Sequence, residues 1–321
     1  MLIEVAELKK TYVHYERGGS FFDAVKSIVH RKAIRVEALK GISFTIEPGE
    51  LVGFLGPNGA GKSTTIKILT GVLYPSSGRV QVAGYVPWRD RVKYVAGIGA
   101  VFGQKSQLIW DIPPVDAFLM NKAIYRIPDK EYRATLDLLV SLLEVERHIK
   151  TPTRQLSLGE RMRCEFIMAM LHRPQIVFLD EPTIGLDVVA KEKIRSFIKT
   201  MNEQGVTFIL TTHDLGDVER LAKRVILINR GELIFDNTIE ALRGYLGKKK
   251  FVTVRTAKPL VTPVFPGMRV LNPFSEYQME MELDVEAVEL NTFIHYLDEE
   301  YGIKDLIIEE PPIEDILKSL Y

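Results

Sequence analysis

Apolar and polar residues alternate in blocks that predict strands and helices in turn over much of the chain. Nearly continuous runs of Val, Ile, Leu and Phe at 51–56, 176–180 and 206–212 predict strands that are buried on both faces. Helical patterns separate these runs, which is typical of an α/β domain with a largely parallel sheet. Residues 3–8 and 36–46 predict an antiparallel β addition to this domain.

Two local patterns interrupt the alternation. Residues 113–174 have helical periodicity and few strand signals, so we expect a helical subdomain at about 105–174, inserted into the sheet domain. Residues 17–35 place five apolar side chains on one helical face, with basic side chains near or opposite it. This extra helix either packs on its own domain or contacts a membrane surface or a membrane-protein partner.

A change of pattern after a run of three lysines predicts a second domain. Short β segments at 251–256 and 280–285 precede a helix over 286–301, in which four apolar side chains repeat at helical spacing. We therefore expect one large domain over 1–247 and a small C-terminal α+β domain over 248–321.

The composition is that of an ordinary globular protein. Hydrophobic residues make up 46% and charged residues 26% of the 321, which argues against a disordered, collagen-like or membrane-embedded chain. The single cysteine, Cys164, excludes an intramolecular disulfide and a Cys-rich zinc module and fits a reducing compartment. Because neither a secretory signal nor an apolar run of about 18 residues is found, we expect a cytosolic protein that reaches any membrane through a partner or a surface contact.

A phosphate-binding loop pattern follows the first buried strand. Residues 56–64 read GPNGAGKST between a predicted strand and a predicted helix, which is the context that this pattern requires. Its glycines let backbone N–H groups wrap a polyphosphate, Lys62 would reach the β- and γ-phosphates, and the Ser63 hydroxyl would ligate Mg²⁺. The pattern assigns phosphate binding to Gly56, Asn58, Gly59, Ala60, Gly61, Lys62, Ser63 and Thr64.

The strand at 176–180 ends in two carboxylates, Asp180 and Glu181. Beside a phosphate loop, Asp180 would enter the Mg²⁺ shell, and Glu181 would face the γ-phosphate, where it could polarise a water. An Asp-Glu pair by itself is more often part of a surface loop. The phosphate loop in the same domain favours the catalytic interpretation.

Residues 156–160, LSLGE, resemble the signature motif of ATP-binding-cassette (ABC) ATPases, which usually reads LSGGQ. Four further segments agree with this family in order and spacing: Gln104 with its Q-loop, 185–187 with its D-loop, 211–214 with its switch-histidine segment, and Tyr12 with its adenine-stacking aromatic. The resemblance covers about the first 240 residues. It implies a P-loop ABC ATPase domain with a mixed sheet, which binds ATP and Mg²⁺.

The resemblance also implies that two chains pair head to tail. Each ATP would then lie between one chain's phosphate loop and the partner's Ser157 and Gly159, at a helix N-terminus that supplies donors to the γ-phosphate. His213 would hydrogen-bond the γ-phosphate and position the attacking water. Gln104 would touch Mg²⁺ and report its occupancy to a partner, with Gln107 as an alternative. The catalytic set implied is Glu181, His213, Lys62 and Gln104, and the metal set is Ser63, Gln104 and Asp180.

Two positions of the signature depart from the family pattern. Leu158 replaces a glycine, so the backbone there loses access to positive φ. Glu160 replaces a glutamine and cannot donate a hydrogen bond. Because Ser157, Gly159 and Glu181 are intact, we expect both sites of a homodimer to be active.

One cassette, no heptad arm and one cysteine favour a subunit that drives a separate membrane permease. Residues 57–69 and, less closely, 309–317 resemble the exporter branch of drug- and sodium-efflux ATPases, whereas the 17–35 segment resembles a helix of polysaccharide exporters. We expect export by a dimer at the cytoplasmic face of the cell membrane. The alternative is a soluble ABC ATPase that acts on a nucleic-acid or ribosomal partner. Trp110 either receives the permease or is a local core aromatic.

The net charge of zero, with 42 basic and 42 acidic residues, argues against a DNA packager, and we expect no nucleic-acid partner. Residues 276–321 hold 14 acidic and 2 basic residues, so the rest of the chain is net basic. A basic ATPase body suits phosphate ligands and an anionic inner-membrane face, although two solvated surfaces of unlike composition explain the split equally well. The small second domain would steady or regulate the dimer, or serve as a structural cap.

Overall fold

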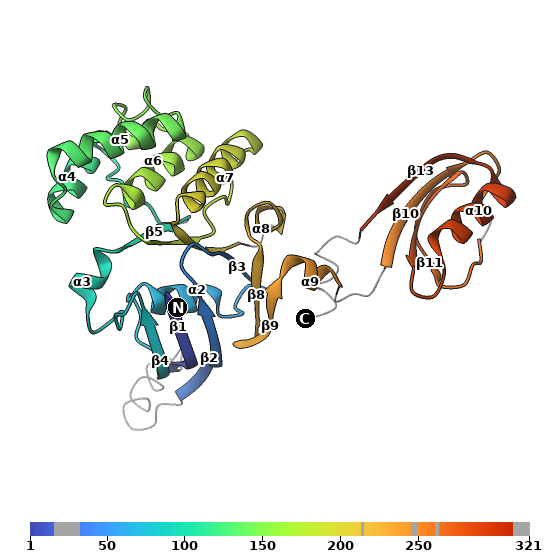
Figure 1. The fold of residues 1–321 in the computed structure, drawn as a ribbon, viewed down its shortest axis with the longest axis horizontal. Coiled ribbons are helices and arrows are strands. Elements are labelled where there is room, and N and C mark those ends of the chain that lie inside the picture. Colours follow the sequence, from blue (N-terminus) through green and yellow to red (C-terminus); the bar gives the residue numbers. More distant parts are fainter. Residues whose placement is uncertain (16–32, 104, 213–214, 245–248, 261–262, 311–321) are drawn as a thin grey trace, which may run out of the picture. The chain divides into compact units, whose positions relative to one another are not determined.

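The chain divides into two units, residues 1–237 with two sheets and residues 238–321 with one sheet (Figure 1). The sequence pattern places this boundary at 247/248. The structure assigns the short helix α9 (Ile239–Gly244) to the second unit instead. The computed structural model describes residues 1–15, 33–103, 105–212, 215–244, 249–260 and 263–310.

A six-stranded sheet forms the centre of the first unit. Its strand order is β5-β6-β7-β3-β8-β9, and the first five strands run parallel, as the buried apolar runs predict. Strand β9 follows β8 through the two-residue turn of Arg230 and Gly231, which have φ of 48° and 80°, as a tight hairpin turn requires. The strands are β3 (Leu51–Leu55), β5 (Ile98–Phe102), β6 (Ile176–Asp180), β7 (Thr207–Thr211), β8 (Arg224–Asn229) and β9 (Glu232–Thr238).

A three-stranded antiparallel sheet, in the order β2-β1-β4, is the expected β addition. It consists of β1 (Ile3–Tyr15), β2 (Ala33–Ile46) and β4 (Ser77–Val82), so β1 and β2 are longer than the sequence pattern predicts. Residues 33–35, at the end of the predicted 17–35 helix, belong to β2. The rest of the predicted helix, residues 17–32, lies outside the described residues.

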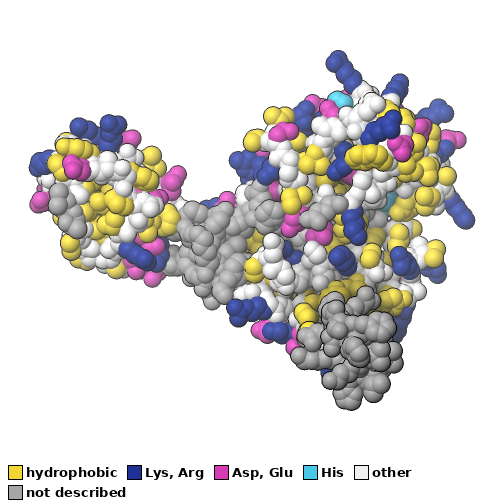
Figure 2. Space-filling view, turned by 180° about the vertical axis from the view of Figure 1, so that it is seen from behind, with side chains coloured by type: hydrophobic (Ala, Val, Ile, Leu, Met, Phe, Trp, Pro, Cys, Tyr) yellow, Lys and Arg dark blue, Asp and Glu magenta, His cyan; other side chains and the backbone are white. Residues whose placement is uncertain are grey.

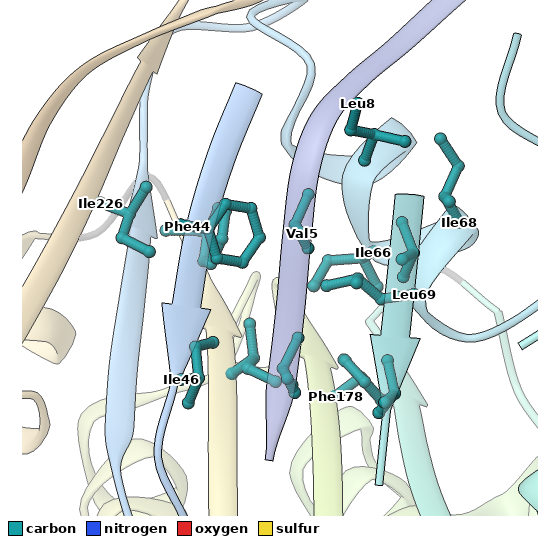
Figure 3. Close-up of a cluster of buried hydrophobic side chains, with 14 of the residues drawn as sticks. Val5, Leu8, Phe44, Ile46, Ile66, Ile68, Leu69, Phe178 and Ile226 are labelled. Carbon is teal, nitrogen blue, oxygen red and sulfur yellow. The ribbon is translucent and has the colours of Figure 1, made fainter. Parts of the chain in front are cut away.

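The core of the first unit lies between these two sheets, around helix α2 (Lys62–Leu69). Apolar side chains from both sheets and from α2 meet there (Figure 3). Burial of each such side chain contributes about 1.5–3 kcal/mol, so this cluster fixes where α2 begins relative to the sheets. The side chains labelled in Figure 3 are Val5, Leu8, Phe44, Ile46, Ile66, Ile68, Leu69, Phe178 and Ile226.

Between β5 and β6, the regular elements of the described residues are all helices, in agreement with the expected helical subdomain. Helices α4, α5 and α7 pack against α6, which runs through the middle of this group (Figure 1). Every helix in the described part of the chain is too short or too polar to cross a bilayer. The helices of the first unit not yet given are α3 (Arg91–Val95), α4 (Pro114–Tyr125), α5 (Asp129–Leu143), α6 (Leu158–Met170), α7 (Val188–Glu203) and α8 (Leu215–Leu221), with a 3-10 turn at Thr153–Gln155.

Besides α9, the second unit contains a four-stranded antiparallel sheet, in the order β11-β12-β10-β13, and the helix α10 (Leu290–Tyr301), which packs on that sheet. The α+β composition agrees with the prediction, but the sequence pattern misses β11 and β13. Helix α10 begins at 290 rather than 286, because the Asp284 side chain accepts hydrogen bonds from the N–H groups of Glu286 and Ala287 and holds a turn there. The strands are β10 (Lys249–Thr256), β11 (Met268–Ser275), β12 (Gln278–Asp284) and β13 (Ile303–Glu309).

Basic and acidic segments of the sequence mix within the second unit. Lys249 pairs with Glu282 at 2.8 Å, and Glu310 pairs with Arg243 at 2.9 Å and with Lys250 at 3.0 Å. Figure 2 shows side chains of both signs on the visible face of each unit. The imbalance between the two units is therefore smaller than the split along the sequence: residues 238–321 hold 15 acidic and 9 basic residues, and residues 1–237 hold 27 acidic and 33 basic residues.

Removal of core volume should destabilise the first unit far more than removal of the same atoms from its surface. Ile226 is fully buried in the cluster of Figure 3, whereas Ile124 is 71% exposed on α4. Ile226→Ala should lower the free energy of unfolding by about 2–5 kcal/mol, and Ile124→Ala should change it by less than about 0.5 kcal/mol. Urea denaturation followed by circular dichroism measures both. Equal midpoints for the two variants would contradict this assignment of the core.

Candidate active site

The phosphate loop joins β3 to α2, and two of its glycines are required by close backbone contacts. Gly56 has φ 152°, and a Cβ there would lie 2.1 Å from the carbonyl oxygen of Ile228. Gly61 has φ 115°, and its Cβ would lie 2.7 Å from the carbonyl oxygen of Ala38. The N–H of Gly231 donates to the carbonyl of Ala60 at 3.0 Å. Strand β2 and the β8–β9 turn therefore hold the loop in shape.

Lys62 is the first residue of α2, and its side chain is turned into the loop. It is 6% exposed, and its Nζ donates to the carbonyl oxygens of Gly56 at 2.5 Å and Pro57 at 3.1 Å. Burial lowers the pKa of Lys62, and the nearby carboxylates of Glu181 and Asp180 oppose that shift. The loop thus holds an ammonium group beside two carboxylates.

The acidic pair at the end of β6 lies opposite the loop. Asp180 Oδ1 accepts hydrogen bonds from Ser63 Oγ at 3.2 Å and Thr211 Oγ1 at 2.5 Å. Glu181 has left-handed backbone with φ 52°, and its N–H donates to the carbonyl of Thr211 at 2.9 Å. A Cβ on Gly103 would lie 2.1 Å from the Glu181 carbonyl oxygen, so the chain after β5 closely abuts Glu181. Such strained positions occur where surrounding contacts fix a functional side chain.

Ser63, Gly103, Asp180 and Glu181 line one cavity of about 790 Å³, a volume that suits a small-molecule ligand. Its polar lining residues are Asn58, Ser63, Lys67, Lys105, Asp180 and Glu181. A hydroxyl and carboxylates are oxygen ligands of the kind that Mg²⁺ takes, and two lysines at the same cavity suit phosphate oxygens. The donor set therefore fits a polyphosphate that carries a divalent cation.

The signature segment forms the N-terminus of α6, as predicted, and Glu160 has a structural role there. Ser157 is the N-cap: its Oγ accepts from the Glu160 N–H at 3.3 Å, and its own N–H donates to Glu160 Oε2 at 2.8 Å. The other carboxylate oxygen of Glu160 lies 3.0 Å from His148 Nε2. Glu160 acts as an acceptor in this capping box, so the loss of a donor relative to glutamine leaves the helix start intact.

Leu158 and Gly159 pack the start of α6 against the D-loop and α7. Leu158 is helical, so the positive φ that a glycine would permit is not used here. Its Cδ2 lies 3.2 Å from where a Cβ on Gly185 would be, and a Cβ on Gly159 would lie 2.8 Å from the Cβ of Ala190. Gly159 is therefore needed for packing within one chain, whatever it contacts outside it.

The structure brings only part of the sequence-predicted set to the cavity. Gln104 and His213 lie outside the described residues. Tyr12 is half-buried in β1, with the Lys10 ammonium 5.2 Å from its ring centroid, and like Ser157 and Gly159 it is absent from the residues that line the cavity. Of the loop residues, Asn58 and Ser63 line the cavity, Ala60, Gly61 and Lys62 are buried, and Thr64 is half-buried.

Sequence reasoning assigned no role to Thr211, Lys67 or Lys105. Thr211 precedes the switch-histidine position by two residues, so its place in a matching segment was a usable signal. Lys67 and Lys105 line the cavity. No motif marked them, because they are brought there by α2 and by the chain after β5.

Trp110 is a surface residue, which rules out the alternative of a local core aromatic. Its side chain is 54% exposed, and the Arg161 guanidinium lies 6.0 Å from its ring centroid. Its carbonyl accepts from the N–H of Arg154 at 3.0 Å, which fixes the backbone at this position.

The capping role of Glu160 predicts a pH-dependent stability. The hydrogen bond from the Ser157 N–H lowers the pKa of Glu160, so the ionised carboxylate stabilises the folded chain above its unfolded pKa of about 4.3. That stabilisation is lost as the pH falls through the lower, folded pKa. Glu160→Gln should therefore melt below the parent at neutral pH, and the gap should close in acid. Thermal unfolding across pH measures this, with exposed Glu131→Gln as the control; a gap that persists in strong acid would contradict it.

Several known proteins are similar to this chain. The family model described as ABC transporter matches residues 39–184. The ABC transporter ATP-binding protein NatA of Bacillus subtilis (strain 168) is 30% identical over 64% of this chain and 84% of its own length. The linearmycin resistance ATP-binding protein LnrL of the same organism is 28% identical over 88% of this chain and 93% of its own length.

A similar solved structure has the same fold and holds the products of ATP hydrolysis. The dimeric post-hydrolysis state of the ATP-binding cassette MJ0796, bound to ADP and Pi, has a TM-score of 0.61 and 27% identity, covering 74% of this chain and 98% of that chain. This chain also has a phosphate loop, a strand that ends in two carboxylates and a capped signature helix. The chain therefore belongs to the ABC transporter family, as one of its ATP-binding and ATP-hydrolysing proteins.

Proposed function

We propose that this chain is the ATPase subunit of an ABC exporter, in which two copies, or this chain and a homologous ATPase, pair head to tail and drive a separate permease. One observation carries the proposal: the phosphate loop, Asp180 and Glu181 share a cavity to which the signature residues of the same chain do not contribute. A cassette built in this way lacks part of its site until a second chain supplies it. The similar cassette MJ0796 is dimeric.

The residues around the cavity divide into holding and activating groups. Lys62 would exchange the carbonyls of Gly56 and Pro57 for β- and γ-phosphate oxygens, and the loop N–H groups would bind the remaining phosphate oxygens. Ser63 and Asp180 would hold Mg²⁺, and Gln104 would touch it, as the family resemblance implies. When bound, the ion neutralises phosphate charge. Tyr12 would stack on the adenine ring.

Glu181 and His213 would carry the chemical step. The strained backbone of Glu181, fixed by Thr211 and Gly103, supports a role in which its carboxylate takes a proton from the attacking water. His213 would hydrogen-bond the γ-phosphate and orient that water. Ser157 and Gly159 of the partner subunit would donate to the γ-phosphate from the N-terminus of α6.

Export is supported by the similarity to proteins named for resistance. LnrL is named for linearmycin resistance, and DrrA3 of Streptomyces coeruleorubidus, 26% identical over 84% of this chain, for daunorubicin resistance. Exposed Trp110 lies on the loop that begins at the cavity, and it offers a permease an aromatic anchor of the kind that dominates interfaces. A permease partner would place the chain at the cytoplasmic face of the cell membrane.

Glu181→Gln tests the proposed reaction. The amide cannot take a proton from water, so ATP hydrolysis should fall by about 100-fold or more, while ATP binding persists and an ATP-bound dimer accumulates. Hydrolysis is followed by phosphate release, and dimer by size-exclusion chromatography with light scattering. Glu131→Gln, an exposed carboxylate on α5, is the matched control and should hydrolyse ATP at the parent rate. A Glu181→Gln protein that hydrolyses ATP at near the parent rate would remove Glu181 from this role.

Trp110→Ala tests the permease contact. Loss of a buried aromatic anchor costs about 2 kcal/mol or more, so recovery of integral membrane subunits with the tagged chain from detergent-solubilised membranes should fall by more than about tenfold. Phe274→Ala, an equally exposed aromatic in the second unit, is the control. Unchanged recovery with Trp110→Ala would separate this residue from the interface, and recovery of ribosomes in place of membrane subunits would support the soluble alternative.

A further inference from the structure

A carboxylate is buried in the middle of α6, away from the cavity. Glu165 is 3% exposed, and both of its oxygens lie 3.0 Å from the N–H of Gln107. Its Oε1 also accepts the Leu108 N–H at 3.4 Å and the Ser106 hydroxyl. Three consecutive residues after β5 therefore donate to one side chain.

All three of these donors are neutral groups. Burial raises the pKa of Glu165, and the hydrogen bonds from Ser106, Gln107 and Leu108 oppose that shift. An apolar side chain would fill this place in the core without a desolvation cost. What a carboxylate adds is a fixed geometry, because its two oxygens can accept several N–H and O–H groups at once.

The loop that Glu165 holds begins at the ATP cavity. Gly103 and Lys105 line the cavity, and the Lys105 N–H donates to the carbonyl of Phe102 at 3.0 Å. The Gln107 side chain adds a second connection, since its Nε2 donates to the carbonyl of Ala100 in β5 at 2.5 Å. A rearrangement of the cavity wall would therefore reach the residues held by Glu165.

The other end of this connection is the signature. Helix α6 runs from its Ser157 cap through Glu165 as one hydrogen-bonded helix. It also contacts the far end of the same loop, where Arg161 lies against the ring of Trp110. The loop and the signature helix are thus joined at two places, and Glu165 is the buried one.

We propose that Glu165 is a positioning residue that locks the loop over 105–110 to α6, so that the nucleotide in one cavity sets the place of the signature end that completes the partner's cavity. This inference rests on the head-to-tail dimer of the proposed function. Glu165 itself contacts no substrate. Its effect is on ATP-driven pairing of two chains rather than on ATP binding to one chain.

The test uses the full chain in the Glu181→Gln background, where the ATP-bound dimer accumulates. Glu165→Ala should raise the ATP concentration needed for half-maximal dimerisation by about tenfold, equivalent to about 1.4 kcal/mol. The affinity of the dilute monomer for a fluorescent ATP analogue should stay at the parent value. Light scattering and fluorescence titration measure the two quantities.

Two further variants separate positioning from general loss of stability. Ser106→Ala removes one donor from Glu165 and should shift dimerisation in the same direction by less, and Glu165→Gln, which keeps one acceptor oxygen, should be intermediate. Asn121→Ala is the matched control. Asn121, on α4, donates through Nδ2 to the carbonyl of Met168 on α6, the helix that carries Glu165, at 2.8 Å. Loss of this hydrogen bond should lower the melting temperature, while the ATP concentration for half-maximal dimerisation stays at the parent value.

Parent-like dimerisation of Glu165→Ala and Ser106→Ala would overturn the role of Glu165 and leave the proposed function standing. An equal shift in Asn121→Ala would overturn it too, because any loosening of α6 would then suffice. If Glu181→Gln alone forms no ATP-dependent dimer, the proposed function fails, and the role of Glu165 falls with it.

Discussion

The nucleotide site depends on the register of three parallel strands, β3, β7 and β6, whose carboxyl ends lie next to one another. Phe54 in β3 and Asp180 in β6 are both register partners of Thr211 in β7. The phosphate loop, the acidic pair and Thr211 therefore leave the sheet at the same edge. Because these strands are held by apolar burial on both faces, the residues beyond their ends can be polar and strained without weakening the core.

Two charged groups at this edge, Lys62 and Asp180, have partners that limit their movement. The Lys62 ammonium is held by loop carbonyls, and Asp180 Oδ1 by two hydroxyls. Lys62 can exchange these carbonyls for phosphate oxygens, because its N–H groups donate to either acceptor. The Asp180 carboxylate can exchange a hydroxyl donor for a cation. Helix α6 is held by its own chain at two places, through the Ser157–Glu160 capping box at its start and through the buried Glu165 carboxylate in its middle.

Local patterns predicted the parts of the molecule that local physics determines. The buried strands, the phosphate loop, the acidic strand end and the start of α6 are each marked by a pattern of residues that are adjacent in sequence. The sequence pattern missed β11 and β13, and it could not foresee that Glu160 would pair with His148 or that Glu165 would hold Ser106, because these contacts join residues 12 and 59 positions apart. Exposure of Trp110 was likewise undecided, since one aromatic carries no periodicity.

The contact between Gly231 and Ala60 has a consequence for the order of folding. The phosphate loop occurs early in the chain, but its Ala60 carbonyl is held by a turn 171 residues further on, between the last two strands of the central sheet. Contacts of such sequence separation form late, because a long segment of chain must first be closed. A growing chain would thus complete its nucleotide loop together with the last strands of its central sheet, and it could not bind ATP firmly until nearly the whole first unit had left the ribosome.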